Sequence, residues 1–214
     1  MIRKMKDSYT DRFGHLVTVE DGLETYIDER GMYTLKKFCG NKNIVSVPEG
    51  IQSIFIDAFS RSKVEEVFLP DSVLEIGARS FQFCNGLESI IVPSSVKYIG
   101  EKAFNNCSNL RTVVFSGSLK YLGKNCFSGT MIESAYFPKG ILSTLGPIYA
   151  DCSHLKVAVI EEKEMTLNTG EFSKCDNLEL VYYDGRFDNL PPLIRYKIEK
   201  KGAIRIKPLS EKKQ

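Results

Sequence analysis

A repeat of 22 or 23 residues constrains this chain more strongly than any other feature of its sequence. The segment Phe81-Gln-Phe-Cys84-Asn-Gly-Leu87 is a clear copy, and the aromatic residue of each copy lies 11 positions after the residue that opens the unit. The units open at Pro48, Pro70, Pro93, Ser116, Pro138 and Glu161, and their aromatic residues are Phe59, Phe81, Phe104, Phe127, Tyr149 and Phe172. A period of this length is typical of a solenoid, in which each repeat forms one coil of a stack.

Alternating apolar residues mark a strand before each unit opens. Leu87, Ile90 and Val92 are spaced by three and then two residues, and the alternation is typical of a half-buried strand. Pro93 lacks a backbone donor and therefore ends the strand. The same frame assigns inward positions to Leu110, Val113, Phe115, Ile132, Ala135, Phe137, Leu178, Val181 and Tyr183.

The remainder of each coil is predicted to hold a second short extended piece and a turn. After Pro93, the extended piece is Val96–Gly100, and Lys102–Cys107 is expected to form a helical turn that directs Phe104 into the core. A glycine shares one register in three coils, which indicates a turn with positive φ; Asn168 replaces it in the last coil and tolerates the same conformation. These glycines are Gly77, Gly100 and Gly123.

Stacking is expected because no single coil can bury its own apolar edge. The predicted fold is a β-rich, right-handed solenoid of six coils with short helical turns, in which like residues form aromatic, cysteine and aliphatic columns. Residues 1–15 are expected to be flexible, 16–47 to form cap strands, 48–183 to form the solenoid, and 184–214 to form a C-terminal cap and basic tail. A short helix is expected to start at Pro191-Pro192.

The repeat resembles the BspA-like class of leucine-rich repeats. The pattern that carries the resemblance is Leu87-x-x-Ile90-x-Val92-Pro93-x-x-Val96-x-x-Ile99-Gly100-x-x-Ala103-Phe104-x-x-Cys107-x-x-Leu110, and it covers about residues 34–183. This resemblance implies a leucine-rich repeat fold and a role in interaction or adhesion, mostly at the cell surface or after secretion.

The cysteines and histidines favour structural roles over chemistry. Cys84, Cys107, Cys152 and Cys175 share one register, with Ser62 and Thr130 at the same position in the short coils, so buried free thiols are expected. No C-x-x-C spacing, nucleophile–base pair or phosphate-binding loop is present, and His154 lies in a loop. An enzyme, a cofactor, a metal and a small-molecule substrate are therefore not expected.

The outward side of the predicted strands offers the best candidate site. Strand parity turns six apolar or aromatic side chains away from the core, and such a stripe is a candidate surface for a protein partner. The alternative is that these residues reflect only the preference of strands for such side chains. The six are Phe68, Ile91, Val114, Tyr136, Val159 and Tyr182. A neighbouring column is predicted to be a solvated rim: Glu65, Glu88, Arg111, Glu133, Lys156 and Glu179.

Charge and hydropathy narrow the function further. Hydrophobic residues make up 43% of the chain, which indicates a globular protein, and the net charge of +2 does not favour nucleic-acid binding over the whole domain. No apolar run is long enough to span a bilayer, and no secretory signal is visible, which leaves the compartment open. The leading hypothesis is a non-enzymatic protein-binding module, and the alternative is a structural or adhesion repeat that acts as a spacer.

Overall fold

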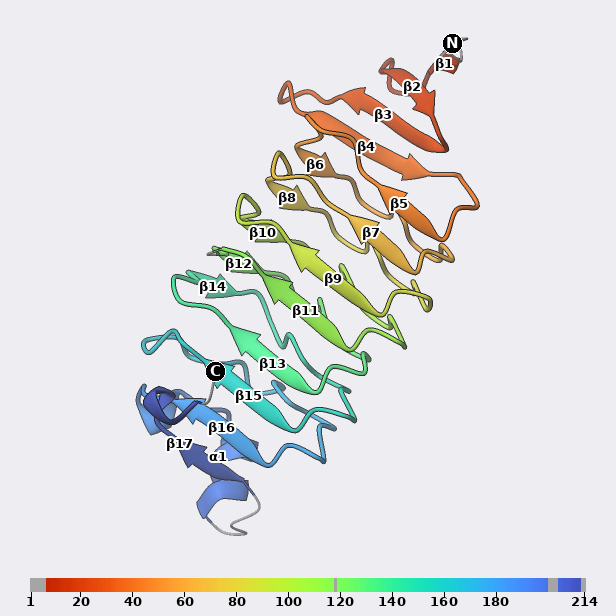
Figure 1. Ribbon diagram of the computed structural model, residues 1–214. Coiled ribbons are helices and arrows are strands. Elements are labelled where there is room, and N and C mark those ends of the chain that lie inside the picture. The colour runs from red at the N-terminus through yellow and green to blue at the C-terminus, as the bar shows by residue number, and fades with distance from the viewer. Residues whose placement is uncertain (1–6, 118, 200–203, 213–214) are drawn as a thin grey trace.

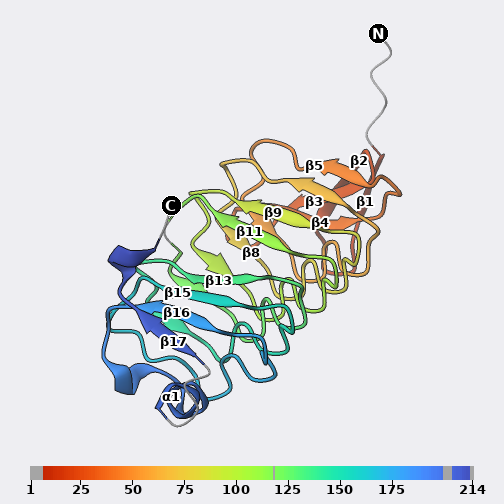
Figure 2. The same cartoon turned by 60° about the horizontal axis from the view of Figure 1, so that its bottom comes forward.

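The computed structural model describes residues 7–117, 119–199 and 204–212, and within them the chain is a β-solenoid of about 7 turns with little helix. The turns follow one another along a single stack, with the N-terminal strands at one end and helix α1 (Pro192–Glu199) at the other (Figures 1 and 2). The predicted six coils are present, and the residues before Pro48 add one more turn because β4 and β5 already follow the same path.

An antiparallel meander begins the stack. It consists of β1 (Asp7–Thr10), β2 (Leu16–Glu20), β3 (Leu23–Ile27) and β4 (Tyr33–Phe38), and the last three agree with the expected cap strands. The first strand lies inside the segment that was expected to be flexible, because its backbone pairs with β2 from Asp7 to Thr10. Residues 1–6 of that segment lie outside the described part of the chain.

The second short extended piece of each coil joins one long parallel sheet. Its strands are β6 (Ser53–Ile54), β8 (Glu75–Ile76), β10 (Tyr98–Ile99), β12 (Tyr121–Leu122) and β14 (Ser143–Thr144). Together with the meander they form a single nine-stranded sheet, called here the long sheet. It connects every coil from the N-terminal cap to β14 without interruption.

The other strands form the opposite side of the stack, and the surface they turn away from the core is called here the outer face. These strands are β5 (Ile44–Ser46), β7 (Glu66–Phe68), β9 (Ser89–Val92), β11 (Thr112–Phe115), β13 (Ser134–Phe137), β15 (Val157–Ile160), β16 (Leu180–Tyr183) and β17 (Arg205–Lys207). They divide into three sheets, β5–β7, β9–β11 and β13–β15–β16–β17. The hydrogen-bonded ladder is therefore interrupted between β7 and β9 and between β11 and β13.

An aromatic stack fills the core. The ring centroids of Phe59 and Phe81 are 4.9 Å apart and those of Phe81 and Phe104 are 5.0 Å apart, with interplanar angles of 6° and 4°. These separations match the spacing of neighbouring strands, so each ring lies over the ring of the previous coil. The stack runs from Phe38 to Tyr149. The predicted aromatic column is confirmed from Phe59 to Tyr149, whereas Phe172 is buried but packs edge-on against Phe137 with ring centroids 6.1 Å apart.

The cysteine column is also confirmed, and each thiol is buried and free. The Cys84 thiol donates to the carbonyl oxygen of Phe59 at 3.1 Å, and the Cys107 thiol donates to that of Phe81 at 3.0 Å. Cys152 and Cys175 repeat the arrangement with Phe127 and Tyr149. Each cysteine therefore satisfies a buried carbonyl of the preceding coil. The hydroxyls at this position in the short coils bond differently: Thr130 donates to the Phe127 carbonyl of its own coil at 2.8 Å, and the Ser62 hydroxyl lies 3.4 Å from the Cys84 thiol.

The turn around the aromatic residue differs from the prediction. Lys102–Cys107 is a turn with left-handed residues at Lys102 (φ 56°) and Asn106 (φ 56°), not a helical turn. The same pair of left-handed positions flanks the aromatic residue in other coils, at Asp57 and Arg61, Arg79 and Phe83, and Asn125 and Gly129. The Phe104 N–H donates to the Cys126 carbonyl at 2.8 Å, so these turns also bind coil to coil.

The prediction of positive φ at Gly77, Gly100 and Gly123 is wrong, as it is for Asn168. The structure gives a different reason for these glycines. A Cβ atom on Gly77 would lie 2.6 Å from the Ile54 carbonyl oxygen, and one on Gly100 would overlap the backbone of Ala78. Glycine is required here because two backbones approach closely.

A buried glutamate replaces backbone pairing near the last coil. Up to Phe127, the aromatic N–H donates to a carbonyl of the following coil, as the Phe127 N–H does to Ile148 at 3.2 Å. The Tyr149 N–H donates instead to the side chain of Glu171 at 2.7 Å, and the Ile148 N–H donates to the same carboxyl at 2.8 Å. Glu171 is fully buried, and burial raises its pKa to about 8.

The C-terminal residues close the stack and then turn back. After η1 (Phe187–Asn189) and α1, strand β17 pairs in parallel with β16. The short helix η2 (Leu209–Glu211) then returns beside β16 (Figure 2). Residues 209–212 of the predicted basic tail therefore contact the solenoid although residues 210–212 are exposed, and residues 213–214 lie outside the described part.

Candidate partner-binding surface

The column of residues predicted to form the binding stripe lies on the outer face, in register from strand to strand. Phe68, Ile91 and Val114 are 54%, 61% and 47% exposed. Ile91 pairs with Val114, and Tyr136 with Val159 and then Tyr182. The first three residues, on β7, β9 and β11, are called here the uncovered half.

The other three residues do not form an open surface. Val159 is only 4% exposed, and Tyr136 and Tyr182 are half-buried, so the prediction of a six-residue exposed stripe is wrong for this half. The chain's own C-terminal segment contacts two strands of this half: η2 lies against β16, and the Lys212 ammonium lies over the Tyr136 ring on β13. β15, which carries Val159, is paired between those two strands. These three positions are called here the covered half.

The contacts of the covered half show how this face holds a chain segment. The Lys212 ammonium lies 5.1 Å from the centre of the Tyr136 ring and 3.9 Å from the Glu161 carboxylate. The Tyr136 hydroxyl donates to the other oxygen of Glu161 at 2.7 Å, and burial with this carboxylate raises the pKa of that hydroxyl. The Leu209 N–H donates to Asp184 at 3.0 Å. A cation, an aromatic ring and a carboxylate thus meet on the outer face.

A hollow marks the uncovered half at the interruption between β7 and β9. It has a volume of about 420 Å³ and includes Phe68 and Ile91 in its lining. No strand ladder joins β7 to β9, and the hollow lies where these two strands are not paired. The sequence does not reveal this interruption, although it separates coils whose lengths differ by one residue.

Three glutamates edge the hollow: Glu65, Glu66 and Glu88. All are exposed, as predicted for the rim column that contains Glu65 and Glu88. Glu65 accepts a hydrogen bond from the Asn43 amide at 2.9 Å. Among the residues that the structure describes, none of the three makes an ion pair, whereas Glu133 of the same column pairs with Lys156 at 3.1 Å. The sequence did not single out Glu66, which occupies a column otherwise rich in serine, threonine and aliphatic residues.

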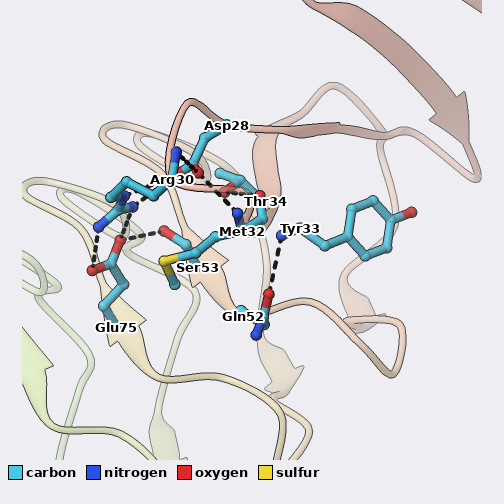
Figure 3. Close-up of polar contacts among 8 residues, drawn as sticks. All are labelled: Asp28, Arg30, Met32, Tyr33, Thr34, Gln52, Ser53 and Glu75. Carbon is cyan, nitrogen blue, oxygen red and sulfur yellow. Dashed lines mark hydrogen bonds and ion pairs between the residues drawn. The ribbon is translucent and has the colours of Figure 1, made fainter.

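A separate polar cluster fastens the N-terminal cap to the solenoid (Figure 3). Arg30, in the turn between β3 and β4, donates to Glu75 on β8 at 3.0 Å and to Asp28 at 2.8 Å. Glu75 also accepts from the Ser53 hydroxyl at 2.7 Å. The hydrogen bond from Arg30 lowers the pKa of Glu75. Every carboxylate of this cluster is engaged, so its arrangement fits a structural role.

Family comparison places this repeat unambiguously. A family described as the BspA type leucine rich repeat region matches residues 29–156 and 78–193, with six copies. The chain belongs to the BspA-type leucine-rich repeat family. Its matched residues include every strand of the uncovered half, so the candidate surface is part of the repeat itself and not of an added domain.

Solved structures of leucine-rich repeat proteins share this fold. A leucine rich cell surface protein from Faecalibacterium prausnitzii is 24% identical, with a TM-score of 0.57 over 81% of this chain and 41% of that one. A leucine-rich repeat protein from T. pallidum is 16% identical, with a TM-score of 0.51 over 89% of this chain and 97% of that one. The chain thus spans less than half of the F. prausnitzii protein. The comparison with curated proteins gave no match.

Within the described residues, no helix has the length and apolar composition needed to cross a bilayer, and no three His, Cys, Asp or Glu side chains gather as metal ligands would. His15 is engaged with Asp11 at 3.2 Å, and His154 contacts only the neighbouring Ser153 in the hydrogen bonds of the described part. Both histidines therefore have local structural partners.

Proposed function

We propose that this BspA-type repeat is a protein-interaction module that binds its partner through the uncovered half of the outer face. The observation that carries the proposal is the exposure of Phe68, Ile91 and Val114 on successive strands beside a hollow, while equivalent residues further along are covered by the chain itself. Exposed apolar side chains that adjoin one another over a concave site are typical of protein contacts.

The test removes the apolar surface without disturbing the core. Immobilised wild type, a Phe68→Ala/Ile91→Ala variant and a Leu142→Ala control are exposed to an extract of the native host. Leu142 is 66% exposed and lies beside the long sheet, away from the proposed surface. A protein retained by wild type and control but lost from the double variant supports the proposal. Equal retention by all three proteins contradicts the proposal.

A second candidate is a spacer or adhesion element at the cell surface. The uninterrupted long sheet and aromatic stack favour it, since both run through most of the stack and suit an elongated support. The structural relative from F. prausnitzii is a cell surface protein, and the match covers 41% of its chain. For a spacer, the double variant would leave every binding property unchanged, and lengthening the stack by one repeat would preserve function.

A further inference from the structure

We infer that the uncovered half binds a short, basic segment of a partner protein, whose apolar side chains contact Phe68 and Ile91 and whose lysine or arginine side chains lie among Glu65, Glu66 and Glu88. This inference rests on the proposed function and specifies the chemistry of the partner. Two independent observations point to it: the unpaired carboxylates around the apolar hollow, and the segment already bound further along the same face.

The charges around the hollow indicate that the partner segment is positively charged. The three carboxylates edge one hollow of about 420 Å³ and make no ion pair in the described part of the chain. The nearest basic residue of the rim column is Arg111 in the coil after Glu88, and it too makes no ion pair among the described residues. Like charges that gather around an apolar surface favour a partner of opposite sign, because complementary potentials guide encounter and exclude wrong partners.

The covered half supplies the geometry. There the chain's own segment places Leu209 and Lys212 on the outer face, with the ammonium over the Tyr136 ring and beside Glu161. The uncovered half offers the same combination of an exposed ring, Phe68, and nearby carboxylates. A cation that lies close to both an aromatic face and a carboxylate is attracted by both groups. The C-terminal segment is a single turn of 3-10 helix followed by Lys212, and it contacts β16 and Tyr136 on β13, so a short chain segment suits this face.

The occupant is a different protein and not the C-terminal segment of a second copy. In this chain that segment is already engaged: β17 pairs with β16, Leu209 is bound to Asp184, and Lys212 is bound at Tyr136. A second copy would have to release all of these contacts before its basic residues could reach another molecule.

The experiment uses a fluorescently labelled peptide of about nine residues with alternating lysine and leucine, and a matched peptide with glutamate in place of lysine. Fluorescence anisotropy measures binding to the full chain. The lysine peptide is expected to bind at least about tenfold more tightly than the glutamate peptide, and to weaken as salt rises from about 0.05 M to about 0.5 M. Equal affinity of the two peptides overturns the inference.

Matched variants locate the binding. Glu66→Gln/Glu88→Gln is expected to weaken the lysine peptide about fivefold, as expected for the loss of two exposed charge contacts. Glu133→Gln/Glu179→Gln changes two glutamates of the same rim column beside the covered half and is expected to leave affinity unchanged. An equal loss in both variants overturns the inference, because it would mean general attraction to an acidic surface.

Two further outcomes separate this inference from the proposed function. If a host partner is lost from Phe68→Ala/Ile91→Ala but retained by Glu66→Gln/Glu88→Gln, the interface stands and the basic partner is excluded. If light scattering shows a dimer that Phe68→Ala/Ile91→Ala abolishes, a second copy occupies the face and the inference is overturned. Loss of the host partner in both variants supports it.

Discussion

The Glu171 carboxyl group accepts a hydrogen bond from the backbone N–H of Tyr149 in the preceding coil at 2.7 Å, in place of the coil-to-coil backbone hydrogen bond that the aromatic residues from Phe59 to Phe127 make. The side chain is fully buried. It repairs the stack at the point where Pro147, which has no N–H, interrupts the regular pattern.

This relationship makes stability depend on pH. Burial raises the pKa of Glu171 from 4.5 to about 8 in the folded chain. The proton is held more tightly in the folded state, so the stabilisation is complete below about pH 4.5 and is lost as pH rises through about 8, amounting to several kcal/mol at most. The urea midpoint of wild type is expected to fall from pH 5 to pH 8 more than that of Glu171→Gln. The exposed Glu164→Gln is the control, and identical pH dependence in all three would contradict this account.

The aromatic stack is expected to dominate the stability of the core. Phe104→Ala removes a fully buried ring between Phe81 and Phe127 and should cost about 3–5 kcal/mol in the free energy of unfolding. Phe68→Ala, on the outer face, should cost less than about 1 kcal/mol because its ring is 54% exposed. Urea denaturation measures both, and comparable losses would show that the rings are not the main support of the stack.

The close approach of successive backbones predicts a sharp glycine requirement. Gly100→Ala would force a methyl group onto the backbone of Ala78 and should destabilise the chain by about 2 kcal/mol or more. Gly170→Ala is the matched control, because its methyl group would approach only the Pro147 side chain, at 3.3 Å. The urea midpoint of Gly100→Ala is expected to lie below that of Gly170→Ala. Equal midpoints would contradict the requirement for glycine at position 100.

Thiol labelling should distinguish one cysteine from the other five. Cys39 is exposed, whereas Cys84, Cys107, Cys126, Cys152 and Cys175 are buried. A thiol reagent should modify one group in the native protein and all six after unfolding. The reaction of Cys39 should be slow near neutral pH, because partial desolvation of the thiol and its hydrogen bond to Glu24 raise its pKa even though the residue is exposed. Native Cys39→Ser should not react, and rapid labelling of a second thiol would be inconsistent with the packed column.

The contact between Arg30 and Glu75 should tie the cap to the solenoid. Arg30→Ala should lower stability by about 1 kcal/mol, a modest value because Arg30 is 55% exposed. Because Arg30 lowers the pKa of Glu75, this contribution is present above the unfolded pKa and is lost as pH falls through the folded value. Lys42→Ala breaks a fully surface pair and serves as the control. No change in the acid unfolding of Arg30→Ala would argue against the contact.

The sequence predicts the periodic features of this protein well, because they depend on register alone. The aromatic and cysteine columns, the cap strands β2, β3 and β4 and the helix α1 follow from residue spacing and turn residues. Residue spacing does not predict which parts of the outer face are covered by other segments of the chain. Strand parity places Val159 in the outward column between Tyr136 and Tyr182, but it does not show that Val159 is buried in the folded chain, where residues 209–212 return to the neighbouring strands.

The glycine column shows a second limit of the same kind. A recurring glycine indicates either a left-handed turn or a close backbone approach, and the sequence pattern is identical for both. The interpretation chosen from sequence was the turn, whereas the structure places the left-handed residues two positions either side of the aromatic residue. Likewise, the repeat pattern does not mark Glu171 as the buried glutamate of the last coil.

The unequal continuity of the two sides has a mechanical consequence. The long sheet runs unbroken through nine strands, while the outer face is hydrogen-bonded only within three sections. Bending of the stack should therefore concentrate at the two interruptions. The long sheet would stay paired, and the outer sections would move apart from one another. Phe68 and Ile91 lie on either side of the first interruption. A change in the curvature of the stack would therefore change the distance between them and adapt the width of the hollow to a bound segment.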